Sequence, residues 1–141
     1  MRYIISCALI CAILLLCGPT VRAGNDFAGD FRDSTLRIDY VLAGAPQGDR
    51  PSPIVAIEGM SRYRGWGGRR INLGSTPLAG NADVTITDAV TGDTLYIQPF
   101  STLFHEWLVS DATDVPAAME GTVMLPMPRR AVYVRISLRD K

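Results

Sequence analysis

The chain has very little cysteine or histidine from which to build a reactive centre. Its three cysteines, Cys7, Cys11 and Cys17, lie in the first 17 residues, and His105 is the single histidine among 141 residues. Residues after Cys17 therefore offer no thiol nucleophile, no cysteine-ligated zinc and no disulfide. One histidine also cannot supply the roughly three protein ligands that a catalytic zinc ion needs.

An excess of charge and a long apolar run are missing as well. The formal net charge is zero, so electrostatics give no reason to expect nucleic acid or an anionic membrane surface as a partner. The longest apolar stretch, residues 4–16, is interrupted only by Ser6. It is shorter than the roughly 20 residues that a membrane-spanning helix needs.

The first 23 residues have the pattern of a secretory signal peptide. A positive start at Arg2 precedes the apolar stretch, Gly18-Pro19 ends it, and Val21-Arg22-Ala23 is a small-x-small cleavage signal. We expect cleavage after Ala23 and a secreted, periplasmic or cell-surface protein. A retained anchor and a lipoprotein acylated at Cys17 are the alternatives. Against the second, Leu16 is larger than the residue that normally precedes a lipidated cysteine.

Removal of residues 1–23 changes what the composition implies. The remaining 118 residues keep all 14 acidic residues and lose Arg2 and Arg22, so their net charge is −2. They contain no cysteine and must be stabilised by an apolar core. A chain of this length buries about two thirds of its unfolded surface, which is sufficient for one domain. We predict a single domain over residues 24–141.

Alternation of apolar and polar residues predicts an all-β fold. Period-two patterns typical of half-buried strands occur at 35–43, 83–87, 94–97, 122–125 and 132–138. Gly92 lies between the second and third of these and predicts a β-hairpin. No amphipathic helix longer than about 12 residues is evident. We therefore predict an antiparallel β-sandwich, jelly-roll or immunoglobulin-like, of six to eight short strands.

Four segments give weaker or interrupted patterns. Ile54–Ile57 and Thr102–Val109 suit either a strand or a short helix. Ser61–Gly68 contains three glycines and is expected to be irregular. Gly44–Pro53 is predicted to be a loop, and Pro126 is predicted to end the strand before it.

The motifs of known catalytic sites are incomplete. His105-Glu106 begins like the zinc-peptidase motif His-Glu-x-x-His, but Val109 stands where the second histidine belongs. There is no Gly-x-Ser-x-Gly nucleophile motif, no phosphate-binding glycine loop with its lysine, and no acidic pair that stands out from the rest. We therefore predict no catalytic residue, no metal site and no cofactor, and a protein that is not an enzyme.

Arginine and aromatic residues cluster in one glycine-rich segment. Arg62, Arg64, Arg69 and Arg70 surround Tyr63 and Trp66, a composition typical of contact surfaces. The predicted contact surface therefore consists of Tyr63, Trp66, Arg69 and Arg70, together with Trp107. Its partner would be an extracellular protein or a glycan. The alternative is that the tryptophans fill the core while the arginines pair with acidic residues or face water.

Four blocks of sequence resemble a known family. The first is Phe31–Val41 with Ala43-Gly44, and the second is Gly65–Arg70 followed by Pro77-Leu78 and Gly80-Asn81. The third and most specific is Phe100–Leu108, and the fourth comprises Met119-Glu120, Leu125-Pro126 and Pro128. In this order, the blocks resemble the N-terminal domain of the IgA-peptidase-like secreted zinc metallopeptidases.

The resemblance implies a β-sandwich that precedes a separate zinc-binding catalytic domain. No position in this chain matches the family's zinc motif, and His105 stands where glutamine is common, so no catalytic residue is carried over. We expect a secreted accessory or binding domain, whose partner would be a metallopeptidase catalytic domain, another extracellular protein or a glycan.

Two alternatives to a stand-alone accessory domain remain. The chain could be a truncated or split fragment of a metallopeptidase, or a small enzyme with an unrecognised carboxylate site. A His-Glu-x-x-His sequence in the downstream coding DNA would favour the fragment. Chelator-resistant hydrolysis that is abolished by mutation of one acidic pair would favour the enzyme.

Overall fold

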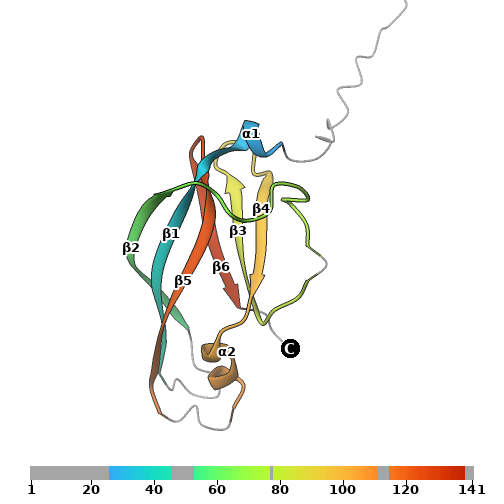
Figure 1. Ribbon diagram of the computed structural model, residues 1–141. Helices are drawn as coiled ribbons and strands as arrows, with labels where there is room; N and C mark the ends of the chain where they lie inside the picture. The colour runs from blue at the N-terminus through green and yellow to red at the C-terminus, as the bar shows by residue number, and fades with distance from the viewer. Residues whose placement is uncertain (1–25, 46–52, 77, 111–114, 139–141) are drawn as a thin grey trace, which may run out of the picture.

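The structure, a computed structural model, describes residues 26–45, 53–76, 78–110 and 115–138 (Figure 1). The predicted signal peptide, its cysteines and most of the predicted loop 44–53 lie outside the described residues. In chain order the elements are α1 Phe27–Asp30, β1 Phe31–Gly44, β2 Ile54–Arg64, β3 Ala82–Asp88, β4 Thr94–Phe100, α2 Leu103–Leu108, β5 Ala117–Pro128 and β6 Val132–Leu138.

The strands form two three-stranded antiparallel sheets. The first sheet has the order β2-β1-β5 and the second has the order β4-β3-β6. Figure 1 shows the two sheets as separate layers, with α1 at one end and α2 at the other. This arrangement confirms the predicted all-β antiparallel sandwich.

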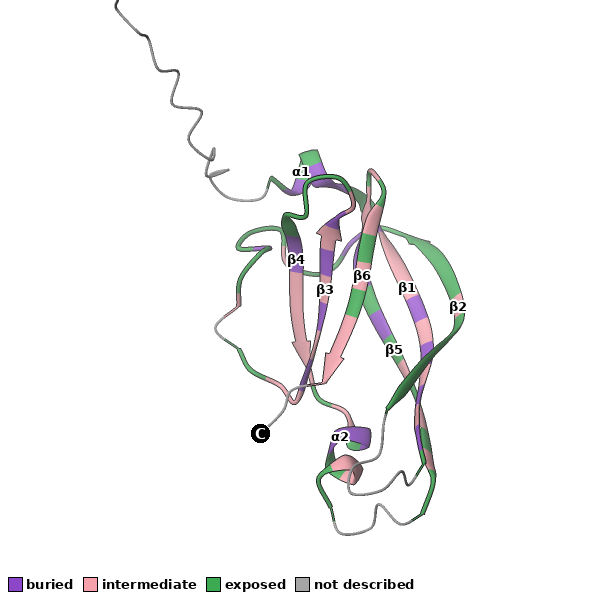
Figure 2. Cartoon of the chain, turned by 180° about the vertical axis from the view of Figure 1, so that it is seen from behind, coloured by how far each residue is buried: buried purple, intermediate pink, exposed green. Residues whose placement is uncertain are grey.

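The core lies between the sheets, where the alternating residues predicted it. Ile38, Tyr40 and Leu42 of β1 are buried, as are Val84 and Ile86 of β3. Each fully buried aliphatic side chain of this size contributes about 1.5–3 kcal/mol relative to an exposed one. Figure 2 shows this alternation as purple bands along β1 and β3.

Two strands extend further than their sequences predict. β2 continues through Ser61–Arg64, and regular pairing ends only at Gly65, whose φ of 75° favours glycine. β5 continues past Pro126 to Pro128. It pairs only with β1, and an edge strand tolerates proline because the missing N–H can face its unpaired side.

The ambiguous segment at 102–109 is helical. Thr102 caps α2, because its side-chain oxygen accepts a hydrogen bond from the Phe104 amide at 3.1 Å. The Asn81 side chain accepts a hydrogen bond from the Thr102 amide and donates one to the Thr102 carbonyl. These contacts hold the start of α2 against the segment that precedes β3. His105 lies on this helix and is buried.

Candidate functional site

Trp66, the centre of the predicted contact cluster, lies in the core. Its side chain is 8% exposed, and its ring packs edge-on against Tyr96, with ring centroids 6.1 Å apart. The indole N–H donates to the Arg69 carbonyl at 3.0 Å, and the Trp66 amide donates to Asp33 at 3.0 Å. This tryptophan therefore anchors the segment that leaves β2.

Arg69 is occupied by the protein's own backbone. Its guanidinium lies over the Tyr96 ring, 5.0 Å from the centroid. It also donates to four backbone carbonyl oxygens, those of Asn72, Leu73, Ser75 and Ile97. A single side chain thus ties the segment after Trp66 to β4.

Arg70 is also paired within the chain. It lies over the Phe27 ring at 4.7 Å and forms an ion pair with Asp33 at 2.6 Å. The hydrogen bond from the Trp66 amide, followed by that from Arg70, lowers the pKa of Asp33. These contacts tie the segment after β2 to β1 and α1.

Tyr63 and Trp107 lie apart from this group. Tyr63 is 51% exposed on β2, whereas Trp107 belongs to α2 and packs on Phe104, with ring centroids 5.2 Å apart. A Cβ atom on Gly44 would come within 2.7 Å of the Trp107 ring, so Trp107 also closes against the end of β1. The five predicted contact residues therefore do not form one surface. Trp66, Arg69 and Arg70 come together, but they bind mainly to the chain itself.

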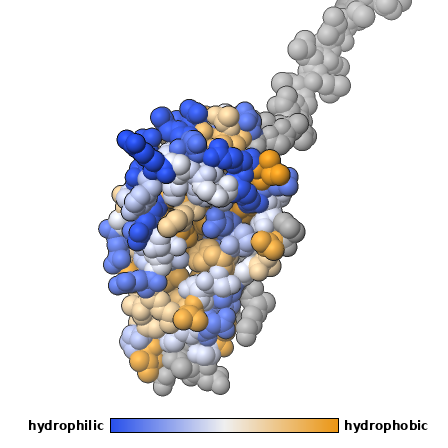
Figure 3. Space-filling view, in the orientation of Figure 1, coloured by the Kyte–Doolittle hydropathy of each residue, from blue (hydrophilic) through white to orange (hydrophobic). Residues whose placement is uncertain are grey.

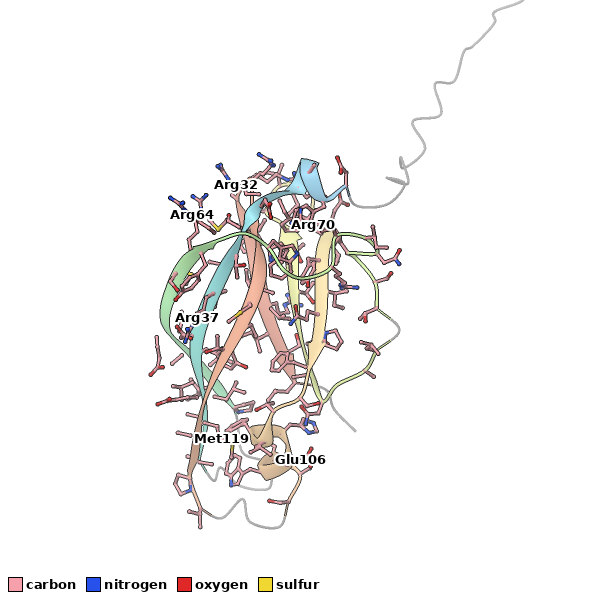
Figure 4. All side chains as sticks on the ribbon, viewed as in Figure 1. Arg32, Arg37, Arg64, Arg70, Glu106 and Met119 are labelled. Atoms are coloured by element: carbon pink, nitrogen blue, oxygen red, sulfur yellow. The ribbon has the colours of Figure 1, made fainter. Side chains whose placement is uncertain are left out.

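The remaining arginines of the cluster face solvent. Arg62 and Arg64 are exposed on β2, and Arg32 is exposed at the start of β1. Figure 4 shows Arg32 and Arg64 pointing away from the body at the end that carries α1. The same end is largely hydrophilic in Figure 3, whereas apolar side chains are more frequent toward α2.

A polar groove lies on the outer face of the first sheet. Its volume is about 520 Å³, and its lining combines three carboxylates, a guanidinium, a hydroxyl and two glycines, contributed by Arg37, Asp39, Glu58, Gly59, Glu120, Gly121 and Thr122. All three strands of the sheet contribute. Because these residues come from separate parts of the chain, only the paired strands bring them together.

An ion pair lies at the centre of this groove. Arg37 Nε donates to Asp39 Oδ1 at 2.8 Å, and the Thr122 hydroxyl donates to the same oxygen at 2.6 Å. The Thr122 hydrogen bond and then that of Arg37 lower the pKa of Asp39. Asp39 raises the pKa of Arg37, with a smaller contribution from Tyr63. These contacts keep Asp39 and Arg37 charged and also place Tyr63 next to the groove.

These groove residues were not among the contact residues predicted from the sequence. One sequence feature could have indicated the groove. The dipeptide Glu-Gly occurs within two strands, as Glu58-Gly59 in β2 and as Glu120-Gly121 in β5. Glycine is unfavourable inside a strand and often marks a place where another group approaches the backbone. At Gly121 this group is Tyr40, because an added Cβ atom would lie 2.5 Å from its ring.

β2 carries a second distinctive surface along its free edge. The strand pairs only with β1, and Figure 2 shows it exposed over nearly its whole length. Val55, Ile57 and Met60 are 42%, 54% and 71% exposed. We refer to these three side chains as the β2 apolar face.

In the part of the chain that the structure describes, no group of three or more histidine, cysteine, aspartate or glutamate residues could hold a metal ion. None of its helices is long and apolar enough to cross a membrane.

Comparison with known proteins identifies the family. No curated protein matches the chain. The family described as Peptidase M64 N-terminus matches residues 26–141, which include every described residue. M64 is the IgA peptidase family. The match covers most of the chain, and the sandwich occupies the same range. The chain therefore belongs to the peptidase M64 N-terminal family.

Proposed function

We propose that this chain is an exported, non-catalytic module that docks onto a partner protein through the β2 apolar face. The partner is an M64-type catalytic domain, which would belong either to a separate chain or to the polypeptide of which this domain is a part. The membership of the family supports this choice of partner, since the family is defined at the N-terminus of a peptidase. The module would position the catalytic domain or its substrate and would carry out no chemistry itself.

The exposure of the β2 apolar face is the observation that carries this proposal. In the register of the first sheet, Val55 is paired with Leu42, Ile57 with Tyr40, and Met60 with Ile38. The three β1 partners are buried, whereas the β2 residues beside them are uncovered. The apolar side chains thus continue the core face of the sheet beyond the area that the second sheet covers. An exposed apolar patch of this kind marks a protein contact.

The free edge of β2 favours a protein partner in particular. An edge strand presents unpaired N–H and C=O groups to which another strand or loop can bind. The segment Ile54–Ile57 contains no charged residue and no proline, the usual features that discourage such pairing. A partner chain could therefore both cover the apolar side chains and satisfy the strand edge.

Substitution of Met60→Lys tests the proposal, because a charge in the β2 apolar face should prevent its burial in an interface. We expect the affinity for an M64 catalytic domain supplied in trans to fall at least about tenfold, with little change in thermal stability. Calorimetric titration of the purified proteins measures this affinity. The matched control is Met124→Lys, which places the same charge at an exposed methionine on the opposite face of the same sheet.

Equal loss of affinity in the two methionine variants, or none in either, would contradict docking through the β2 apolar face. An absence of any binding between the unmodified chain and the catalytic domain would contradict the choice of partner.

A further inference from the structure

The groove on the outer face of the first sheet has a different chemistry from the β2 apolar face. It is polar, whereas the β2 apolar face continues the inner, core side of the sheet. We propose that this groove binds carbohydrate, with the sugar hydroxyls on the charged groups of the groove and one sugar ring against Tyr63. This site is independent of docking and assigns the chain a second activity.

The shape of the groove leaves room for a ligand. Its volume of about 520 Å³ lies within the usual range of small-molecule sites. Gly59 is paired with Asp39 across the strands, and a Cβ atom added to it would have no heavy atom within 4 Å. A side chain at this position would therefore project into the groove, and glycine keeps that space open.

The polar groups of the groove are complementary to a ligand that both donates and accepts hydrogen bonds. Glu58 and Glu120 belong to the two edge strands of the sheet, and their side chains have no hydrogen bond or ion pair with a described residue. Their carboxylates can only accept hydrogen bonds. Arg37 donates to Asp39 through Nε and also interacts with the Tyr63 hydroxyl, so the groove contains donor groups as well as acceptors. Hydroxyl groups satisfy both kinds of partner, since each one donates and accepts.

The alternative ligand is a basic side chain, because acidic groups outnumber basic ones in the groove. The Arg37–Asp39 pair already satisfies one of the three carboxylates. A basic side chain could pair with the other two, but it has no acceptor for the N–H groups of Arg37. A hydroxyl-rich ligand can serve the carboxylates and the guanidinium together.

Tyr63 supplies the apolar contact that sugar rings require. It lies on β2 two residues from Ser61, the partner of Arg37, and is itself paired with Thr35. Its ring is half exposed and its hydroxyl interacts with Arg37. An exposed aromatic ring with a polar tip can pack on the C–H face of a pyranose while hydrogen-bonding at its rim. The groove and Tyr63 thus form a continuous surface along β1 and β2.

Screening of the purified chain on an array of plant, fungal, mucin and bacterial oligosaccharides tests the proposal. We expect at least one glycan to bind, and we expect Gly59→Gln to reduce its affinity at least about tenfold by filling the groove. The matched control is Gly67→Gln, because a Cβ atom at Gly67 also meets nothing within 4 Å but Gly67 lies outside the groove. Tyr63→Ala should weaken binding, whereas Tyr133→Ala, at an exposed tyrosine on β6, should not.

Thermal unfolding of each variant distinguishes loss of the site from loss of the fold, and all four are expected to unfold near the temperature of the unmodified chain. The absence of binding to every glycan on the array would overturn the proposal. Binding that is equally strong in Gly59→Gln would overturn it as well. Binding of a hexa-arginine peptide that competes with no glycan and is lost in Gly59→Gln would instead identify a basic-peptide site.

Discussion

At the scale of single residues, the chain uses its arginines in two ways. Arg69 and Arg70 bind aromatic rings and polar partners of the chain, although Arg70 remains about half exposed, whereas Arg62 and Arg64 are exposed on β2. A planar guanidinium suits the first use, because it stacks on a ring while its several N–H groups donate in one plane. Clustering in the sequence therefore does not reveal which of these arginines is available to a partner.

Replacement of Arg69 by lysine should destabilise the domain. An ammonium group cannot donate to four carbonyl oxygens at once and loses the stacking on Tyr96. We expect a loss of about 1–3 kcal/mol in the free energy of unfolding, measured by urea denaturation. The exposed Arg64 provides the control, and Arg64→Lys should change this free energy by less than about 0.5 kcal/mol. A loss in Arg64→Lys as large as in Arg69→Lys would contradict this account.

At the scale of elements, helix capping and strand pairing decide the secondary structure of segments whose local sequence is ambiguous. The segment 102–109 suits either a strand or a helix, and its capping residue and the Asn81 contacts select the helix. β5 shows a similar effect, because its place at the edge of the sheet lets it continue through Pro126 and Pro128.

Removal of the α2 cap should weaken this helix. Thr102→Ala deletes the oxygen that accepts from the Phe104 amide and should cost about 1 kcal/mol in the free energy of unfolding. Urea denaturation measures the loss. Thr102→Ser keeps the accepting oxygen and should retain most of the stability. If serine proves as destabilising as alanine, the methyl group rather than the cap is responsible.

At the scale of the whole molecule, one arginine links the two sheets. Arg130, between β5 and β6, donates to Asp30 of α1 at 2.8 Å and to Asp88 at the end of β3. Neighbouring Arg129 donates to the carbonyls of Ala28 and Phe31 at 2.8 Å. α1 and the turn between β5 and β6 are thereby held to both layers at one end of the sandwich.

Asp88, one of the partners of Arg130, makes the stability of the domain depend on acid pH. Hydrogen bonds from the Thr91 and Val90 amides, and then from Arg130, lower the pKa of Asp88 from 3.8 to about 2. The unfolded chain binds a proton at Asp88 more readily than the folded chain does. Ionised Asp88 therefore stabilises the fold fully above about pH 4, and this stabilisation is lost as the pH falls through about 2. We expect the melting temperature to drop over this interval, with a shallower slope in Asp88→Asn.

Calorimetry at a series of pH values measures that slope. Glu58→Gln is the control, because Glu58 is exposed and has no ion pair with a described residue. It should keep the slope of the unmodified chain. Identical slopes in all three proteins would show that Asp88 is not the group responsible.

Much of the sandwich could be predicted from local pattern, whereas the surfaces could not. The alternation in β1, β3 and β6 identified strands, and in β1 and β3 it also identified the buried face, because side chains of a strand point to opposite sides in turn. The same rule fails to describe β2, whose apolar residues look like core residues. The second sheet does not cover these residues, and the sequence of residues 54–60 does not indicate how much of β2 the second sheet covers.

The sequence by itself determined the fold class, the family and the main strands, because side-chain periodicity and the order of the sequence blocks can be read along the chain without the tertiary structure. Its export signal remains a prediction. Only the tertiary structure decided that Trp66 and Arg69 face inward, that the β2 apolar face is open, and that Glu58 and Glu120 border one groove. These properties depend on which strands are neighbours and on how far one sheet covers the other. Both are set by contacts between residues that are distant in the sequence.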